Sequence, residues 1–134
     1  MKIDQDYLKS MLLAFQGSAR PTFYVSDFRD LGIDFEEDRF VFHIELLNDQ
    51  EFVVRDDWEA GVGIQRGAGD DVSWSLVPLR LTARGHEFIE TLENKEVWQA
   101  LKTNFKDASI KTLWEVGKKI FEGYAQKKVE KLLG

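Results

Sequence analysis

The chain lacks cysteine altogether, and it has only 2 prolines, 2 histidines and 2 methionines. The absence of cysteine excludes disulfides, a catalytic thiol and cysteine-bound zinc, and it fits a reducing compartment. No apolar run approaches the roughly 20 residues that a membrane-spanning helix needs. The N-terminal segment carries Asp4 and Asp6 where an export signal has its apolar core. We therefore expect a cytoplasmic protein without membrane contact.

Apolar and acidic residues are abundant. Of the 134 residues, 43% are hydrophobic and 13% aromatic, which is typical of one folded domain of ordinary size. The net charge of −6 is unevenly distributed. Residues 1–93 carry 9 Lys and Arg against 19 Asp and Glu, a balance of −10, whereas residues 94–134 carry 9 against 5, a balance of +4. An acidic body joined to a basic tail predicts that the two parts attract different partners.

The stretch from Asp38 to Arg55 carries the strongest fold signal. Phe40, Ile44 and Leu47 recur at three- and four-residue spacing, which predicts one face of a helix. The short apolar run that begins at Phe52 is rich in β-branched residues and ends at two aspartates, which predicts a strand. A helix that leads directly into a β-ribbon is typical of a winged helix.

Apolar spacing and capping residues place the other helices. They are expected over residues 4–16, 27–31, 82–92 and 109–133, with one more that starts at Asn94, and with caps at Ser26, Thr82, Asn94 and Ser109.

The strand over residues 52–55 is expected to pair with a segment inside residues 72–81. Between them, residues 57–71 contain four glycines and are predicted to form a mobile hairpin tip, with Trp58 anchoring its base. The predicted fold is therefore α+β: a winged helix-turn-helix of three helices plus a β-hairpin wing over residues 1–93. A C-terminal helical extension over residues 94–134 is expected to pack on it.

Two segments resemble a bacterial and phage family, domain of unknown function 2513. One is the helix segment His43–Asp49, with its histidine, spacer pair and two leucines. The other is Leu81–Phe88, followed by Val97–Trp98, and the ending Lys131–Gly134 also fits. The resemblance implies a winged-helix-like fold in a mobile-element setting. It implies no catalytic residues.

No residue pattern predicts an enzyme, a cofactor or a metal centre. His86 and Glu90 lie four apart on one predicted helix, but no further ligand accompanies them. The pairs Asp56–Asp57 and Asp70–Asp71 flank the hairpin tip and leave a hard-cation site as an alternative to ordinary solvated loop ends. The glycine-rich tip has no Lys-Ser/Thr and precedes a strand, so a flexible wing is favoured over a phosphate loop.

His43 allows two interpretations. A lone histidine without a nearby catalytic partner most often hydrogen-bonds a backbone carbonyl and fixes its helix, here against the wing. Alternatively, it lies at the edge of the apolar stripe and contacts a binding partner.

The charge of the predicted recognition helix favours protein over DNA as its partner. Residues 36–50 hold five acids and one arginine, whereas groove-reading helices need cations against phosphate. We therefore hypothesise a non-enzymatic protein–protein interaction module, associated with a phage or mobile element, that presents an acidic face to a basic protein. The predicted contact residues are Glu36, Glu37, Arg39, His43, Asp56 and Asp57.

The alternative hypothesis is a dimeric winged-helix transcriptional regulator that binds DNA. Its dimer would form through the last helix, and its DNA contacts would come from the wing and the basic tail. The predicted contacts are Arg66, Lys118, Lys119, Lys127 and Lys128. A stripe of aromatic residues is expected to be core between the last two helices; it consists of Trp98, Phe105, Trp114, Phe121 and Tyr124.

Overall fold

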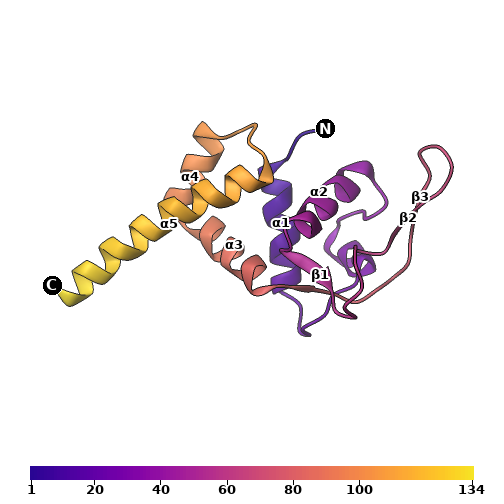
Figure 1. The fold of residues 1–134 in the computed structure, drawn as a ribbon, viewed down its shortest axis with the longest axis horizontal. Helices are drawn as coiled ribbons and strands as arrows, with labels where there is room; N and C mark the ends of the chain where they lie inside the picture. The colour runs from indigo at the N-terminus through magenta and orange to yellow at the C-terminus, as the bar shows by residue number, and fades with distance from the viewer.

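The computed structural model describes residues 1–134 as an α+β fold with six helices and four three-residue strands (Figure 1). The expected α+β class is confirmed. In chain order the elements are α1 (Gln5–Gln16), the 3-10 helix η1 (Val25–Leu31), α2 (Asp38–Asp49), β1 (Val53–Arg55), β2 (Ile64–Arg66), β3 (Val72–Trp74), β4 (Leu79–Leu81), α3 (Ala83–Glu93), α4 (Lys95–Asn104) and α5 (Ile110–Leu133).

Side-chain caps begin four of the helices, as the sequence predicts for Thr82, Asn94 and Ser109. Each of these side chains accepts a hydrogen bond from a backbone N–H in the first turn, and Asp4 does the same for α1. The expected cap at Ser26 is wrong. Helix η1 begins two residues earlier than expected, at Val25, and there the Asp27 carboxylate accepts a hydrogen bond from the N–H of Tyr24.

The strands form two separate antiparallel pairs instead of one hairpin. β1 pairs with β4, with Val53 opposite Leu81, and β2 pairs with β3, with Ile64 opposite Trp74. The expected partner region of β1 is therefore confirmed, but the glycine-rich segment expected to be a mobile tip contains β2. The three residues of β2 lie in this glycine-rich segment and are too few to show a clear alternation in the sequence.

One core joins the whole chain. A single cluster of 24 buried residues extends from Tyr7 in α1 to Trp114 in α5. The Phe52 ring stacks on Phe88 at 4.6 Å, and Trp114 packs edge-on against both rings. The core therefore continues across the predicted boundary between residues 93 and 94.

The first turn of α3 lies directly against the end of α2 and the start of β1. A Cβ atom on Gly85 would lie 2.3 Å from the carbonyl oxygen of Phe52, so only glycine allows this approach. The Thr82 hydroxyl accepts from the N–H of Gly85 at 3.0 Å and donates to the carbonyl of Glu51 at 2.6 Å. This contact sets the position of α2 relative to the C-terminal helices.

The second half of α5 projects from the body of the protein (Figure 1). Gly117 packs closely against Thr91 and Val97, and no residue after it is buried. The expected aromatic core stripe is confirmed for Trp114, while Tyr124 is exposed because the helix has left the body at that point. None of the helices combines the length and apolar character needed to cross a membrane.

Candidate functional site

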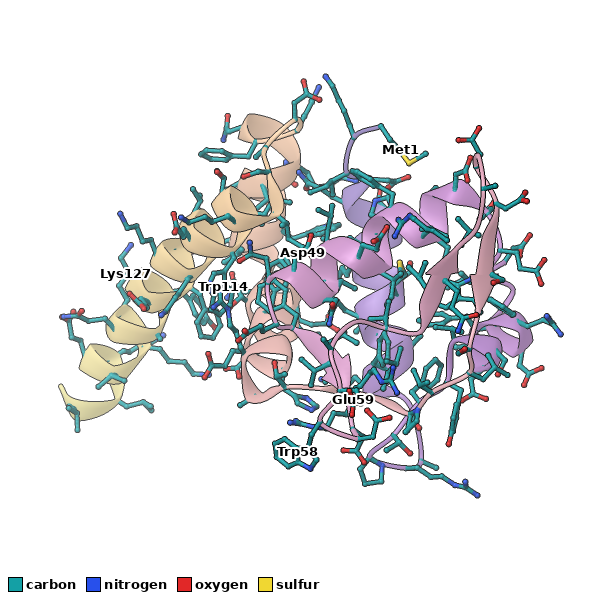
Figure 2. The ribbon with its side chains drawn as sticks, turned by 45° about the vertical axis from the view of Figure 1, so that its right-hand side comes forward. Met1, Asp49, Trp58, Glu59, Trp114 and Lys127 are labelled. Carbon is teal, nitrogen blue, oxygen red and sulfur yellow. The ribbon has the colours of Figure 1, made fainter.

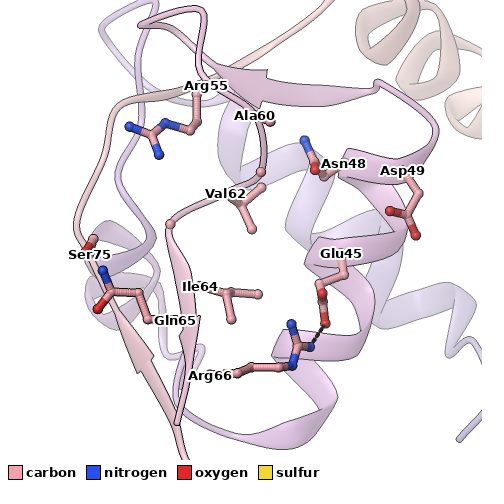
Figure 3. Close-up of a pocket in the computed structure, with 12 residues that line it drawn as sticks. Glu45, Asn48, Asp49, Arg55, Ala60, Val62, Ile64, Gln65, Arg66 and Ser75 are labelled. Carbon is pink, nitrogen blue, oxygen red and sulfur yellow. Dashed lines mark hydrogen bonds and ion pairs between the residues drawn. The ribbon is translucent and has the colours of Figure 1, made fainter.

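A groove runs between α2 and the β2–β3 hairpin. It consists of two adjoining hollows of about 290 Å³ and about 530 Å³, which share Glu45 and Arg66. Figure 3 shows the first hollow, where Val62 and Ile64 point toward α2. We call this region the α2 groove; of the contact residues predicted from the sequence, only Arg66 lines it.

An ion pair crosses the α2 groove. The guanidinium of Arg66 on β2 donates to the Glu45 carboxylate on α2, with Nη2 and Oε1 2.5 Å apart (Figure 3). This hydrogen bond, and then the charge of Glu45, raises the pKa of Arg66 above its usual range. The cation expected to enter a DNA groove is therefore already paired with a carboxylate of the predicted recognition helix.

The α2 groove is acidic. Arg55 and Arg66 are its two guanidinium groups, and both are paired with carboxylates. Five carboxylates line it: Asp38, Glu45, Asp49, Asp70 and Asp71. Because the groove has more carboxylates than cations, it favours positively charged ligands over phosphates.

The expected contact residues before α2 are at the surface. Glu36 lies 4.0 Å from Arg29, and Glu37 lies 3.4 Å from Arg39. The Arg39 guanidinium also covers the ring of Tyr7 at 4.1 Å. Glu36 and Glu37 keep exposed carboxylates at the N-terminal end of α2, where such charge complements the helix dipole.

Asp56 and Asp57 lie on the loop after β1. Strand β1 follows the C-terminal end of α2, opposite to the end at which Glu36 and Glu37 lie. Asp57 binds Arg55 through two hydrogen bonds of 2.9 and 2.6 Å, and this pairing lowers the pKa of Asp57. Asp56 lies 3.5 Å from Arg80. The two groups of predicted acids are thus attached at opposite ends of α2, and no hydrogen bond or ion pair joins them.

His43 is not part of a contact surface, and this expectation is corrected. Its side chain is 1% exposed. Nε2 accepts a hydrogen bond from the N–H of Asp4 at 2.9 Å, which leaves the proton on Nδ1 for the carbonyl of Arg39 at 2.7 Å. The interpretation as a carbonyl-bonded structural histidine is confirmed, but His43 fixes α2 against α1 and not against the wing.

Trp58 is the residue that sequence reasoning placed wrongly. Its side chain is 93% exposed and does not anchor the hairpin. Its φ of +67° is in the left-handed region, which turns the chain outward directly after the two aspartates. The available signal was its setting, because acids both precede and follow this tryptophan in a segment without apolar alternation.

The lysines predicted for DNA contact lie on α5. Lys118 lies over the ring of Trp114 at 5.6 Å, and Lys119, Lys127 and Lys128 are exposed. The C-terminal end of α5 and the β2–β3 hairpin are at opposite ends of the long axis (Figure 1). In a single molecule the hairpin that carries Arg66 and the C-terminal end of α5 therefore lie far apart.

No group of three or more His, Cys, Asp or Glu side chains is arranged to hold a metal ion. Asp56 and Asp57 pair with Arg80 and Arg55, so the alternative of a cation site between them and Asp70–Asp71 has no support.

Comparison with curated proteins and with solved structures gives no match. The model of one family, described as "Hypothetical protein (DUF2513)", matches residues 2–111. This range extends from the residues before α1 to the start of α5, and it includes both internal segments whose resemblance is given above. The ending Lys131–Gly134 lies outside it. The chain therefore belongs to the DUF2513 family.

Proposed function

We propose that this protein is a non-enzymatic protein–protein interaction module with a winged-helix scaffold. The order of its elements supports the scaffold: α1, η1 and α2 precede the β1–β4 pair, and Phe23 bridges to Leu79 of β4. In this reading α2 takes the place of the recognition helix and the β2–β3 hairpin that of the wing. The phage or mobile-element setting and the cytoplasmic location belong to the same proposal.

The observation that carries the proposal is the Glu45–Arg66 ion pair inside an acidic groove. Non-specific DNA affinity depends on the number of cations that neutralise phosphates. Here the wing arginine is neutralised from α2, while Asp38 and Asp49 form no ion pair. A basic protein surface is the partner that this charge distribution favours.

A capture experiment with matched charge variants tests the proposal. The tagged full chain is incubated with a lysate of its native host, and both protein and nucleic acid are identified. We expect a basic protein that elutes with salt and is lost from the triple variant Asp38→Asn, Glu45→Gln, Asp49→Asn. The control variant Glu96→Gln, Asp107→Asn, Glu122→Gln also removes three acids, but from α4, α5 and their connection, and it should retain the protein.

DNA binding is the outcome that would overturn the proposal. The measurement is the electrophoretic mobility of duplex DNA at low salt. A shift by the wild-type chain that is lost in Arg66→Ala would show that the Arg66 side chain reaches phosphate despite its pairing with Glu45.

The projecting half of α5 favours the second candidate function, a dimeric DNA-binding regulator. Tyr124 and Leu132 are exposed there beside Lys127, Lys128 and Lys131. Two such helices packed across a twofold axis would bury these apolar groups and concentrate the lysines. This candidate requires a dimer by light scattering and DNA binding that weakens steeply with salt.

A further inference from the structure

Trp58 differs from the other three tryptophans of the chain. Trp114 is buried, the Trp74 indole N–H donates to the carbonyl of Phe35 at 3.1 Å, and Trp98 lies beneath Lys9 at 4.4 Å. Trp58 is 93% exposed, more than any other large apolar residue of the protein. Figure 2 shows its indole pointing away from the body, with Glu59 beside it. An exposed tryptophan of this kind is a frequent energetic centre of protein interfaces.

The loop that carries Trp58 is held by hydrogen bonds before and after the tryptophan. Before it, the N–H of Asp56 donates to the carbonyl of Pro78 at 2.9 Å, and two hydrogen bonds from Arg55 orient Asp57. After it, the N–H of Glu59 donates to Oδ1 of Asp57 at 3.2 Å. The outward direction of the indole is thus set by the loop, and binding needs little further ordering.

The charge around Trp58 selects the partner's chemistry. Asp56 and Asp57 are already paired with Arg80 and Arg55, whereas Glu59 forms no ion pair. An indole face beside a free carboxylate suits a guanidinium or an ammonium group, which stacks on the ring and pairs with the acid. The unpaired Glu59 carboxylate repels nucleic-acid phosphates and anionic membranes.

The Trp58 loop forms one wall of the α2 groove. Arg55, Ala60 and Gly61 line the first hollow, and Trp58 lies between them in the chain. Trp58 and Glu59 do not line the hollow themselves, so a basic segment in the groove would reach the indole by extending past Ala60.

We propose that Trp58 and Glu59 anchor the protein contact by binding one arginine or lysine side chain of the basic partner. The cation stacks on the Trp58 indole, and the Glu59 carboxylate supplies its counter-ion. This inference rests on the proposed function, and it adds the residues that recognise the partner and the group that they recognise.

Nuclear magnetic resonance with defined peptides tests the anchor. The probes are an acetylated peptide of alternating arginine and glycine, its lysine analogue, and its citrulline analogue, which keeps the shape of arginine without the charge. The full chain is labelled with nitrogen-15, and the Trp58 indole N–H signal is assigned by its loss in Trp58→Ala. We expect the two cationic peptides to shift this signal and the Glu59 amide, and the citrulline peptide to leave both in place.

Variants separate the anchor from the rest of the acidic surface. Trp58→Ala should weaken binding of the arginine peptide about tenfold, and Trp58→Phe should restore part of the loss. Glu59→Gln should weaken binding without moving the Trp58 signal in the free protein. Backbone spectra that match the wild type outside the loop confirm that each variant is folded.

Two results would overturn the inference, and they differ in what they leave standing. One result is that the arginine peptide shifts the amide signals of Glu45 and Asp49 but not the Trp58 indole signal, and that it binds Trp58→Ala as tightly as the wild type. The anchor is then wrong and the acidic-groove proposal stands. If no cationic peptide shifts any signal, both proposals fail.

Discussion

The backbone N–H of Asp4 donates a hydrogen bond to Nε2 of His43, and this contact ties the start of α1 to the middle of α2. The other ring nitrogen, Nδ1, donates to the carbonyl of Arg39. Both bonds are satisfied only by the neutral imidazole, because a protonated Nε2 has no lone pair to accept the N–H of Asp4. The charge state of one buried side chain therefore affects the packing of two helices.

Acid should destabilise the protein through His43. Burial is the largest cause that lowers the pKa of His43 from its ordinary 6.5. Above pH 6.5 the imidazole is neutral in the folded and unfolded chains, so it gives no pH dependence. Below that value the unfolded chain binds a proton that the folded chain does not, and the free energy of unfolding falls by at most about 1.4 kcal/mol per pH unit until the lowered pKa is reached.

Urea unfolding at a series of pH values measures this effect. The reference is His43→Gln, whose amide offers one acceptor and a donor group and does not titrate. We expect the wild type to lose more stability than His43→Gln below pH 6.5. Parallel pH profiles for the wild type and His43→Gln would contradict the prediction.

The same substitution should have opposite effects at two helical glycines. Gly85→Ala places a Cβ atom 2.3 Å from the carbonyl oxygen of Phe52, so α3 must move away from β1, and we expect a loss of about 1–3 kcal/mol. Gly123→Ala meets nothing within 4 Å and should stabilise α5 by up to about 1 kcal/mol. Thermal or urea unfolding measures the stability of both variants. Equal effects would show that the backbone at Gly85 can move away from the Phe52 carbonyl at little cost.

Glu51 occupies a backbone position that suits glycine. Its φ is +59°, and its N–H and that of Phe52 close the C-terminal end of α2 on the carbonyls of Asn48 and Leu47. Glu51→Gly should therefore stabilise the protein by about 1 kcal/mol in urea unfolding, because the left-handed strain is relieved. Glu51→Gln removes the charge and keeps the strain, so it should leave stability within about 0.5 kcal/mol of the wild type. A gain from Glu51→Gln alone would assign the effect to charge.

Removing residues 126–134 should leave the fold intact. All of them are exposed, so the deletion takes no side chain from the core. We expect the free energy of unfolding to change by less than about 0.5 kcal/mol. Light scattering of the same variant separates the two candidate functions, because a loss of dimer would favour the DNA-binding regulator. A large loss of stability would instead show that the projecting helix supports the body.

The sequence predicted the helices well because their signals are local. Thr82, Asn94 and Ser109 begin their helices through hydrogen bonds that span two or three residues, and a cap of this kind needs no knowledge of the rest of the fold. Ser26 shows the limit: Asp27 bonds back to Tyr24 and starts a 3-10 turn before the expected cap.

The candidate site was harder to predict because its contacts are distant in sequence. The sequence predicts Arg66 as a wing cation that contacts DNA, yet its partner Glu45 lies on α2, 21 residues away. The predicted carbonyl bond of His43 is confirmed, but its second partner, Asp4, lies 39 residues away and leaves no local signal in the sequence. The sequence predicts Trp58 at the hairpin base, whereas the bonds around Asp57 turn it outward.

The Thr82 hydroxyl has a mechanical consequence. Thr82 Oγ1 accepts a hydrogen bond from the N–H of Gly85 in the first turn of α3, and it donates one to the carbonyl of Glu51 directly after α2. Sliding of α2 along the C-terminal helices would break the bond from Thr82 to the Glu51 carbonyl, whereas the bond from Gly85 is local to the start of α3. The Thr82–Glu51 bond therefore resists such sliding. A partner that pulls on α2 therefore also pulls on α3, and through the shared core that load extends to the root of α5.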